Sequence, residues 1–138
     1  MNRKKIFLAM IILAVIAAFV GYKMYNKPHV DVAESSSDIV ITADNLVQAF
    51  STDETAANEK YLDKIVEVKG EISSMKLENE KGIVYLKTSD DFASVLCNLS
   101  ESSTQKMNDL KEGQTIVVKG ICTGFLMDVV LVKSEIVE

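Results

Sequence analysis

The feature that most constrains this fold is a Val-Lys-Gly pattern that occurs at residues 68–70 and again at 118–120. In the first copy, Val66 and Val68 alternate with charged residues, which predicts a half-buried strand. The glycine of each copy falls on the apolar face of its strand. An inward glycine in a strand usually marks a bend or a bulge where a barrel closes on itself. Gly70 and Gly120 are therefore predicted to be structural, bending two equivalent strands of one sheet.

The order of the elements narrows the fold class further. Thr42 and Asp44 suit the start of a helix, as N-cap and first-turn acid, and predict one broken or two consecutive helices up to residue 63. A domain over 42–138 then follows the order strand, strand, strand, helix, strand, strand. That order is typical of the OB-fold, a five-stranded Greek-key barrel, here with N-terminal helices packed on it. A small mixed sandwich is the alternative. The strands are expected at 64–75, 83–88, 95–99, 115–122 and 127–137, and the later helix at 100–112.

Two stretches of this domain carry a family resemblance. They are Ala-Asn-Glu-Lys-Tyr at 57–61 and Lys-Gly-Ile-Cys-x-Gly-x-Leu-x-Asp-Val-Val-Leu at 119–131. Over roughly 43–137 the chain resembles the tRNA-anti-like group of OB-fold proteins of the bacterial envelope, many of which have an N-terminal apolar segment. The resemblance implies the fold and an envelope location, and it lends no catalytic residues.

The N-terminal region has the pattern of a membrane anchor. A basic stub at 1–5 precedes the uncharged run 6–22, which as a helix would span roughly 25 Å, the short end of what crosses a bilayer. We expect an uncleaved, single-pass transmembrane anchor at 6–22 and a polar linker at 23–41. The excess of positive charge before the run places the N-terminus in the cytoplasm and the C-terminal domain outside. A cleaved signal peptide, which would leave a secreted protein, and a buried soluble helix are the alternatives.

Charge argues against nucleic acid as a partner. From Pro28 onward the chain has ten Lys, no Arg and twenty Asp plus Glu, which gives a net charge of −10. Such a domain repels phosphate backbones and lacks the guanidinium that binds phosphate in a bidentate manner. Another envelope protein or a small ligand is the expected partner. Binding of single-stranded nucleic acid is an alternative that rests on fold analogy alone, and the sequence does not specify an oligomeric state.

Catalytic and metal-binding patterns are missing from the sequence. His29 is the only histidine and falls in the predicted linker, so neither a metal site nor a catalytic pair can be built around it by local spacing. There is no glycine-rich phosphate loop and no Ser-His-Asp set. We therefore expect no enzyme, no cofactor and no metal.

Cys97 and Cys122 both point into the barrel by strand alternation. Outside the cytoplasm they could form a disulfide, provided that their Cα atoms lie about 4.4–6.8 Å apart. Two buried free thiols are the other interpretation, and the sequence leaves both open.

Candidate binding residues follow from how OB-folds bind oligomers, on the face of strands two and three and on the loops that join strands one to two and four to five. Here the loops are predicted at 76–81 and 123–127, the second around a structural Gly124. The bulky apolar residues 125–127 of the second loop either pack under the barrel or form a contact surface. Asp128, which follows them, either orients a ligand or caps the turn. The face has only one aromatic residue, whereas sites that stack nucleic-acid bases normally have several. The candidates are Tyr85, Lys87, Thr123, Phe125, Met127 and Asp128.

Overall fold

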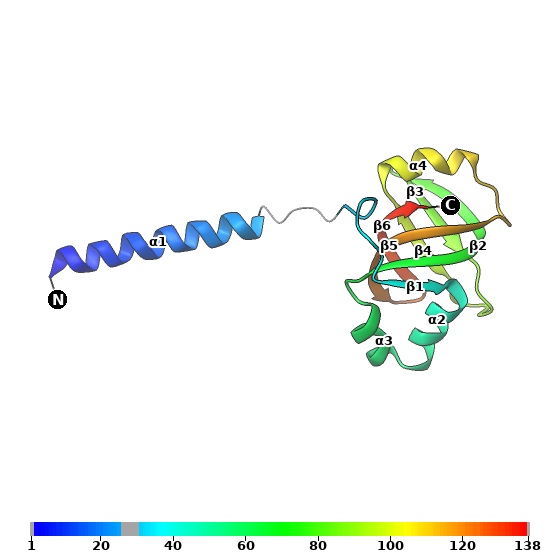
Figure 1. Ribbon diagram of the computed structural model, residues 1–138, viewed down its shortest axis with the longest axis horizontal. Helices are drawn as coiled ribbons and strands as arrows, with labels where there is room; N and C mark the ends of the chain where they lie inside the picture. The colour runs from blue at the N-terminus through cyan, green and yellow to red at the C-terminus, as the bar shows by residue number, and fades with distance from the viewer. Residues whose placement is uncertain (1, 26–30, 138) are drawn as a thin grey trace. The chain divides into compact units, whose positions relative to one another are not determined.

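The computed structural model describes residues 2–25 and 31–137, and the chain divides into two compact units, Met1–Val30 and Asp31–Glu138. The first unit contains helix α1, Arg3–Tyr25, in which no residue is buried (Figure 1). Its mean hydropathy is 2.4, so this helix is long and apolar enough to cross a membrane. The helix includes the predicted segment 6–22 and continues three residues beyond it on each side. His29 lies outside the described residues.

The second unit is a closed barrel with helices at its two ends. Strands β2, β3, β4, β6 and β5 pair in that order, and β2 also pairs with β5, which closes the ring. Strands β4 and β6 pair in parallel, and helix α4 lies between β4 and β5 in the chain. This is the predicted five-stranded OB-fold. The elements are β1 Ile39–Thr42, α2 Ala43–Thr52, α3 Glu54–Tyr61, β2 Ile65–Glu78, β3 Lys81–Leu86, β4 Val95–Leu99, α4 Glu101–Lys106, the short 3₁₀ helix η1 Met107–Asp109, β5 Thr115–Phe125 and β6 Val129–Ile136 (Figure 1).

Strand β1 begins inside the segment 23–41 that is predicted to be a linker, and that prediction is wrong for the C-terminal part of the segment. Ile39 to Thr42 pair in parallel with residues 66–69 of β2. Val32 is only 3% exposed, and the Lys119 ammonium group donates hydrogen bonds to the carbonyl groups of Ala33 and Ser35. The linker prediction relied on the polar composition around residue 35, but this segment packs on the barrel.

Helices α2 and α3 confirm the prediction of two consecutive helices. Thr42 Oγ1 accepts a hydrogen bond from the backbone N–H of Asn45 at 3.3 Å, as expected of an N-cap. Asp53 ends α2 and caps α3, because its Oδ1 accepts from the N–H of Ala56 at 3.1 Å. Figure 1 shows α2 and α3 at one end of the barrel and α4 at the other. The buried face of α2, which includes Phe50, packs on the barrel core.

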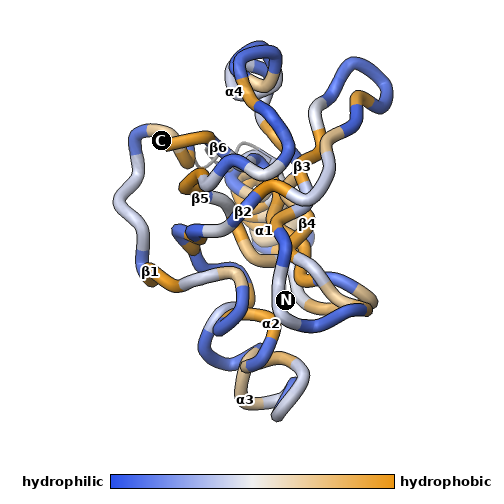
Figure 2. Tube along the Cα trace, turned by 90° about the vertical axis from the view of Figure 1, so that its right-hand side faces the viewer, coloured by the Kyte–Doolittle hydropathy of each residue, from blue (hydrophilic) through white to orange (hydrophobic). Residues whose placement is uncertain are grey.

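The hydrophobic core follows the alternation of the strands. In Figure 2 the hydrophobic segments gather along the strands, whereas the tip of the β2–β3 hairpin is hydrophilic. That hairpin differs from the loop predicted at 76–81, because β2 continues to Glu78 and β3 begins at Lys81. The turn consists only of Asn79 and Glu80, with φ of 49° and 65°. Two residues with positive φ match the twist of the flanking strands, which explains why the strands extend so far.

The two inward glycines lie where the barrel leaves no space for a side chain. A Cβ at Gly70 would lie 3.0 Å from the Cβ of Ala43, at the start of α2. A Cβ at Gly120 would lie 2.6 Å from Ser134 Oγ, beside a shift in the register of β5 and β6. The register shift of β2 falls between Ile72 and Ser74 instead of at Gly70. Gly70 therefore admits the helix that covers it, whereas Gly120 lies at a bulge.

Candidate functional site

A bulge in β5 determines how the β5–β6 hairpin presents its residues. Cys122 pairs with Leu131 and Gly124 pairs with Val130, so β5 contains one more residue than β6 across this interval. Gly124 has a φ of +120°, a backbone conformation that side chains rarely adopt. An extra residue reverses which side chains face inward. Phe125 therefore points into the core.

The predicted loop 123–127 is shorter in the structure and divides into a buried and an exposed part. The Phe125 ring stacks on Phe50, with centroids 6.0 Å apart and planes at 24°, so this residue packs under the barrel. The next two residues remain outside, because Leu126 is 89% exposed and Met127 is 78% exposed. Each of the two alternatives that the sequence left open applies to part of this segment.

Asp128 joins the β5–β6 turn to Ser94, the residue that precedes β4. Its Oδ1 accepts hydrogen bonds from the backbone N–H of Ser94 at 2.8 Å and from the Ser94 hydroxyl at 2.9 Å. The N–H of Val129 donates to the carbonyl of Ser94 at 3.0 Å. These contacts agree with the turn-capping interpretation of Asp128, and they use the carboxylate oxygen that a ligand would otherwise meet.

A row of apolar side chains crosses the outer face of the barrel. Tyr85 of β3 pairs with Leu96 of β4, and Leu96 pairs with Val130 of β6. All three are half-buried, while their sequence neighbours fill the interior. We call Tyr85, Leu96 and Val130 the outer row. Sequence reasoning found only Tyr85, because the other two join it through the pairing of strands that are far apart in the chain.

The outer row leads to a groove between α3 and the β5–β6 hairpin. Its volume is about 370 Å³. From α3 it is lined by residues spaced four apart, which lie on one face of a helix, and from the hairpin by residues on both sides of the bulge. Thr123 Oγ1 donates to the carbonyl of Val130 at 3.3 Å and holds the hairpin wall together. We call this the α3 groove, lined by Glu54, Asn58, Leu62, Thr123, Gly124, Phe125, Leu126 and Val130.

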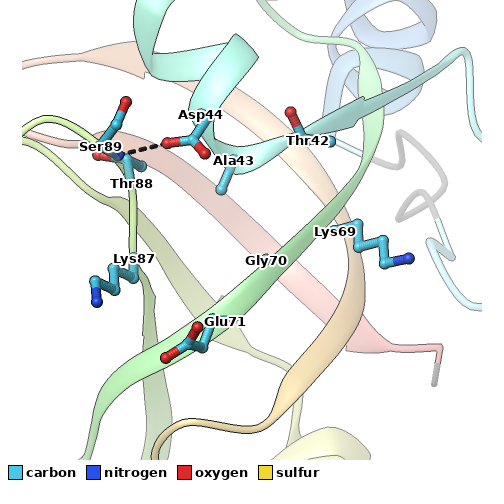
Figure 3. Close-up of a pocket in the computed structure, with 9 residues that line it drawn as sticks. All are labelled: Thr42, Ala43, Asp44, Lys69, Gly70, Glu71, Lys87, Thr88 and Ser89. Carbon is cyan, nitrogen blue, oxygen red and sulfur yellow. Dashed lines mark hydrogen bonds between the residues drawn. The ribbon is translucent and has the colours of Figure 1, made fainter.

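Lys69 and Lys87 border the same hollow but do not converge on one point in it. Lys87 is exposed and borders a hollow of about 320 Å³ above Gly70. Figure 3 shows that Lys69 and Lys87 extend to opposite sides of this hollow, while Asp44 accepts a hydrogen bond from the N–H of Ser89 across its edge. Two ammonium groups that point apart cannot together hold a phosphate, so this hollow lacks the arrangement of an anion site.

A second hollow, about 310 Å³, lies on the other side of Lys87 and is rich in carboxylates. Asp90, Asp91 and Asp128 all line it.

On the outer face of the barrel, Lys76 lies over the Tyr85 ring, 5.9 Å from its centroid, and also pairs with Glu78 at 3.4 Å.

The structure therefore distributes the six predicted binding residues over four places. Tyr85 belongs to the outer row, and Lys87 and Asp128 border the second, carboxylate-rich hollow. Met127 is exposed on the turn. The α3 groove contains Thr123 and Phe125.

Cys97 and Cys122 are both free and fully buried. Both pair with Leu131, Cys97 from one neighbouring strand and Cys122 from the other. Two strand spacings separate their backbones by roughly 9–10 Å, beyond the range for a disulfide, so the disulfide alternative is wrong. Burial raises the pKa of the Cys97 thiol to about 12 and that of the Cys122 thiol above its usual value. Protonated thiols are poor nucleophiles and poor metal ligands.

Among the residues that the structure describes, no group of three or more His, Cys, Asp or Glu side chains is arranged to hold a metal ion.

The Ser103 hydroxyl donates a hydrogen bond to a Glu135 carboxylate oxygen at 2.7 Å. Ser103 is fully buried, and its hydroxyl also accepts from the N–H of Ile136 at 2.9 Å. This hydroxyl group fastens α4 to β6.

Solved structures from several organisms are similar to this chain. A lipoprotein of Klebsiella pneumoniae, provisionally described as nucleic acid-binding, superposes with a TM-score of 0.61 at 18% identity, covering 81% of this chain and 100% of its own. A provisionally assigned aspartyl-tRNA synthetase of Leishmania major gives 0.50 at 15% identity, covering 90% of this chain but only 26% of its own length. Stn1 and Ten1 of yeast give 0.44 at 15% identity, covering 76% and 65%.

At these identities, the likeness to solved structures concerns the fold. No curated protein matches the chain in sequence. The model of the tRNA_anti-like family matches residues 1–136, which include both stretches that carry the resemblance. The chain therefore belongs to the tRNA_anti-like family.

Proposed function

We propose that this protein is a non-catalytic binding module, an OB-fold domain that α1 anchors to the cytoplasmic membrane and that is exposed on the outer side. The anchoring is supported by the length and hydropathy of α1 and by the positive charges that precede it. The binding role is supported by apolar side chains on the outside of the barrel.

One observation carries the binding role. The outer row ends beside Leu126, which is 89% exposed, and Met127, which is 78% exposed. Exposed apolar surface of this kind, in a continuous row instead of scattered single residues, marks interaction sites in soluble domains. It lies on the face and the loop through which OB-folds meet their ligands. A protein surface or a small apolar ligand fits this chemistry.

The proposal of no catalysis rests on the chemistry of the side chains. The two thiols are buried and protonated. The most buried hydroxyl–carboxylate pair, Ser103 with Glu135, already uses its hydroxyl in two hydrogen bonds. Nucleophilic catalysis needs an accessible nucleophile beside a base.

Binding of single-stranded nucleic acid is the second candidate. The Klebsiella lipoprotein with the same fold is provisionally described as nucleic acid-binding, and Lys76 lies over the Tyr85 ring on the OB face. The charge balance of the domain, ten Lys against twenty Asp plus Glu, opposes it.

Three measurements test the proposal. A photo-crosslinking amino acid at position 126 in intact cells is expected to capture a protein, and the same amino acid at Val40, which is 72% exposed on β1, is expected not to. A fluorescent oligothymidylate titrated against the full chain at low salt is expected to show no binding. Salt-dependent binding of that oligonucleotide, lost in Tyr85→Ser, would establish the second candidate instead. A C-terminal topology reporter that is active only in the cytoplasm would refute the outward orientation.

A further inference from the structure

We propose that the α3 groove binds a segment of a partner protein in which bulky apolar side chains accompany a lysine or an arginine. The inference rests on the proposed function as a binding module and specifies the surface and the chemistry of the partner. It is carried by the shape of the groove, the unpaired side-chain amide of Asn58 and the charge of the lining.

The groove walls are apolar and open to solvent. Leu126 from the hairpin is 89% exposed and Leu62 at the end of α3 is 38% exposed, and Val130 lies half-buried at the base. Eight residues of α3 give the wall a length of about 12 Å. A wall of this length fits a few residues of an extended peptide or about two turns of a helix. Covering these side chains would remove apolar surface from water, which favours binding.

Polar groups in the groove suit a peptide backbone. Gly124 has no side chain, and a Cβ placed there would lie 3.7 Å from Leu62 Cδ1 and 3.9 Å from Asn58 Oδ1. The Leu62 and Asn58 side chains therefore lie at contact distance from the space above Gly124, so the helix wall and the hairpin wall meet at this glycine. The side-chain amide of Asn58 forms no hydrogen bond to another described residue, and it offers both donors and an acceptor. The amide of Asn58 can therefore pair with the main chain of a bound segment.

The charge of the groove selects the partner. Glu54 is the only ionisable residue in the lining, and the single ion pair among the described residues is Lys76–Glu78, so its carboxylate is unpaired. The whole domain carries twice as many acidic as basic residues. A cation on the partner would complement this field, and electrostatic complementarity governs specificity and the association rate.

The same charges disfavour other occupants. Nucleic acid would bring phosphates to a lining that contains no Lys or Arg. A second copy of this domain would bring the same net negative charge, and anionic lipid headgroups would be repelled in the same way.

The test is peptide selection on the full chain in nanodiscs of zwitterionic lipid. Random twelve-residue peptides displayed on phage are selected on the wild type after depletion on empty nanodiscs. Enriched peptides are expected to combine Leu, Phe or Met with Lys or Arg. Their affinity is expected to fall at least about tenfold in Leu62→Ser and in Asn58→Ala, as for contacts at the centre of an interface. The matched control Val40→Ser, on exposed β1, is expected to bind like the wild type.

Charge reversal gives a readout that a mere loss of folding cannot reproduce. Glu54→Lys is expected to weaken the selected basic peptides and to strengthen their Lys→Glu counterparts. Cys97 and Cys122 should stay unreactive to maleimide in every variant, which shows that the barrel remains folded.

Three outcomes would overturn the inference. Peptides that lose binding in Tyr85→Ser but not in Leu62→Ser would move the site to the outer row and leave the proposed function intact. Cross-linked dimers of the chain that disappear in Leu62→Ser would identify a second copy as the occupant. Failure to enrich any peptide, together with oligothymidylate binding that Tyr85→Ser abolishes, would overturn the groove assignment and the proposed function together.

Discussion

Replacing Gly120 by alanine tests whether the barrel closes as tightly at this bulge as the structure shows. The added Cβ would lie 2.6 Å from Ser134 Oγ, 3.1 Å from Leu131 Cβ and 3.2 Å from the carbonyl oxygen of Val132. The first distance is far below contact, and Ser134 is fully buried. Overpacking of this kind costs about 1–3 kcal/mol. For a domain of about 100 residues, that lowers the melting temperature by roughly 5–20 °C.

The Ser134 hydroxyl provides a matched compensating change. Its Oγ has no hydrogen-bond partner among the described residues, and an unsatisfied buried hydroxyl costs about 1–3 kcal/mol. Ser134→Ala is therefore expected to be neutral or stabilising. It also removes the atom that an alanine at position 120 would strike. The double variant is expected to be more stable than the sum of the single effects by about 1 kcal/mol.

The assay uses the two cysteines of the chain, both fully buried in the barrel. Maleimide labelling of the full chain in detergent micelles, followed against temperature, reports opening of the barrel without interference from α1. Unchanged labelling in Gly120→Ala, or single effects that add to within about 0.3–0.5 kcal/mol in the double variant, would refute the close packing at Gly120.

Three further predictions concern the hairpin and α4. Phe125→Ala is expected to destabilise the barrel by about 3 kcal/mol, because its ring packs on Phe50, whereas the matched Leu126→Ala should stay within about 0.5 kcal/mol; equal effects in thiol labelling would contradict the bulge. Gly124→Ala is expected to cost about 1–3 kcal/mol through its φ of +120°, and unaltered stability in urea would count against this backbone conformation. Partial burial by itself raises the pKa of Glu135, but hydrogen bonds from surrounding serine hydroxyls lower it below its usual value. The ionised carboxylate therefore stabilises the fold at neutral pH. This contribution is lost as the pH falls through the lowered pKa. Glu135→Gln should therefore cost at most about 1 kcal/mol at pH 7, since solvent screens a partly exposed group. The cost should decrease as the pH falls and disappear once the pH lies below the lowered pKa of Glu135; a constant difference between pH 3 and 7 in tyrosine near-UV circular dichroism would exclude this linkage.

Local patterns in the sequence determined the fold class. Alternation placed Val66 and Val68 inside the barrel, and both are fully buried. Thr42 indicated the start of α2, and its side chain caps that helix. The inward glycines and the order of the elements indicated an OB-fold. Each of these signals lies within one segment of the chain. The spacing of apolar side chains and the capping residues at helix ends are therefore sufficient to predict the element.

The candidate site was decided by tertiary structure. The bulge at Gly124 turned Phe125 inward and left Leu126 exposed. A bulge is defined by the pairing of one strand with another, so it cannot be recognised from the residue pattern of one strand alone. The pairing of β4 with β6 brought Leu96 beside Val130. The same pairing explains why Cys97 and Cys122, both predicted to point inward, lie too far apart for a disulfide.

What the sequence by itself determined is the type of each element and the face that it buries, because these depend on neighbours along the chain. What only the tertiary structure decided is the register between strands and therefore which outer side chains meet. A shift of one residue reverses every side chain beyond it. The outer row and the α3 groove depend on that register, so they emerge only once the barrel is closed.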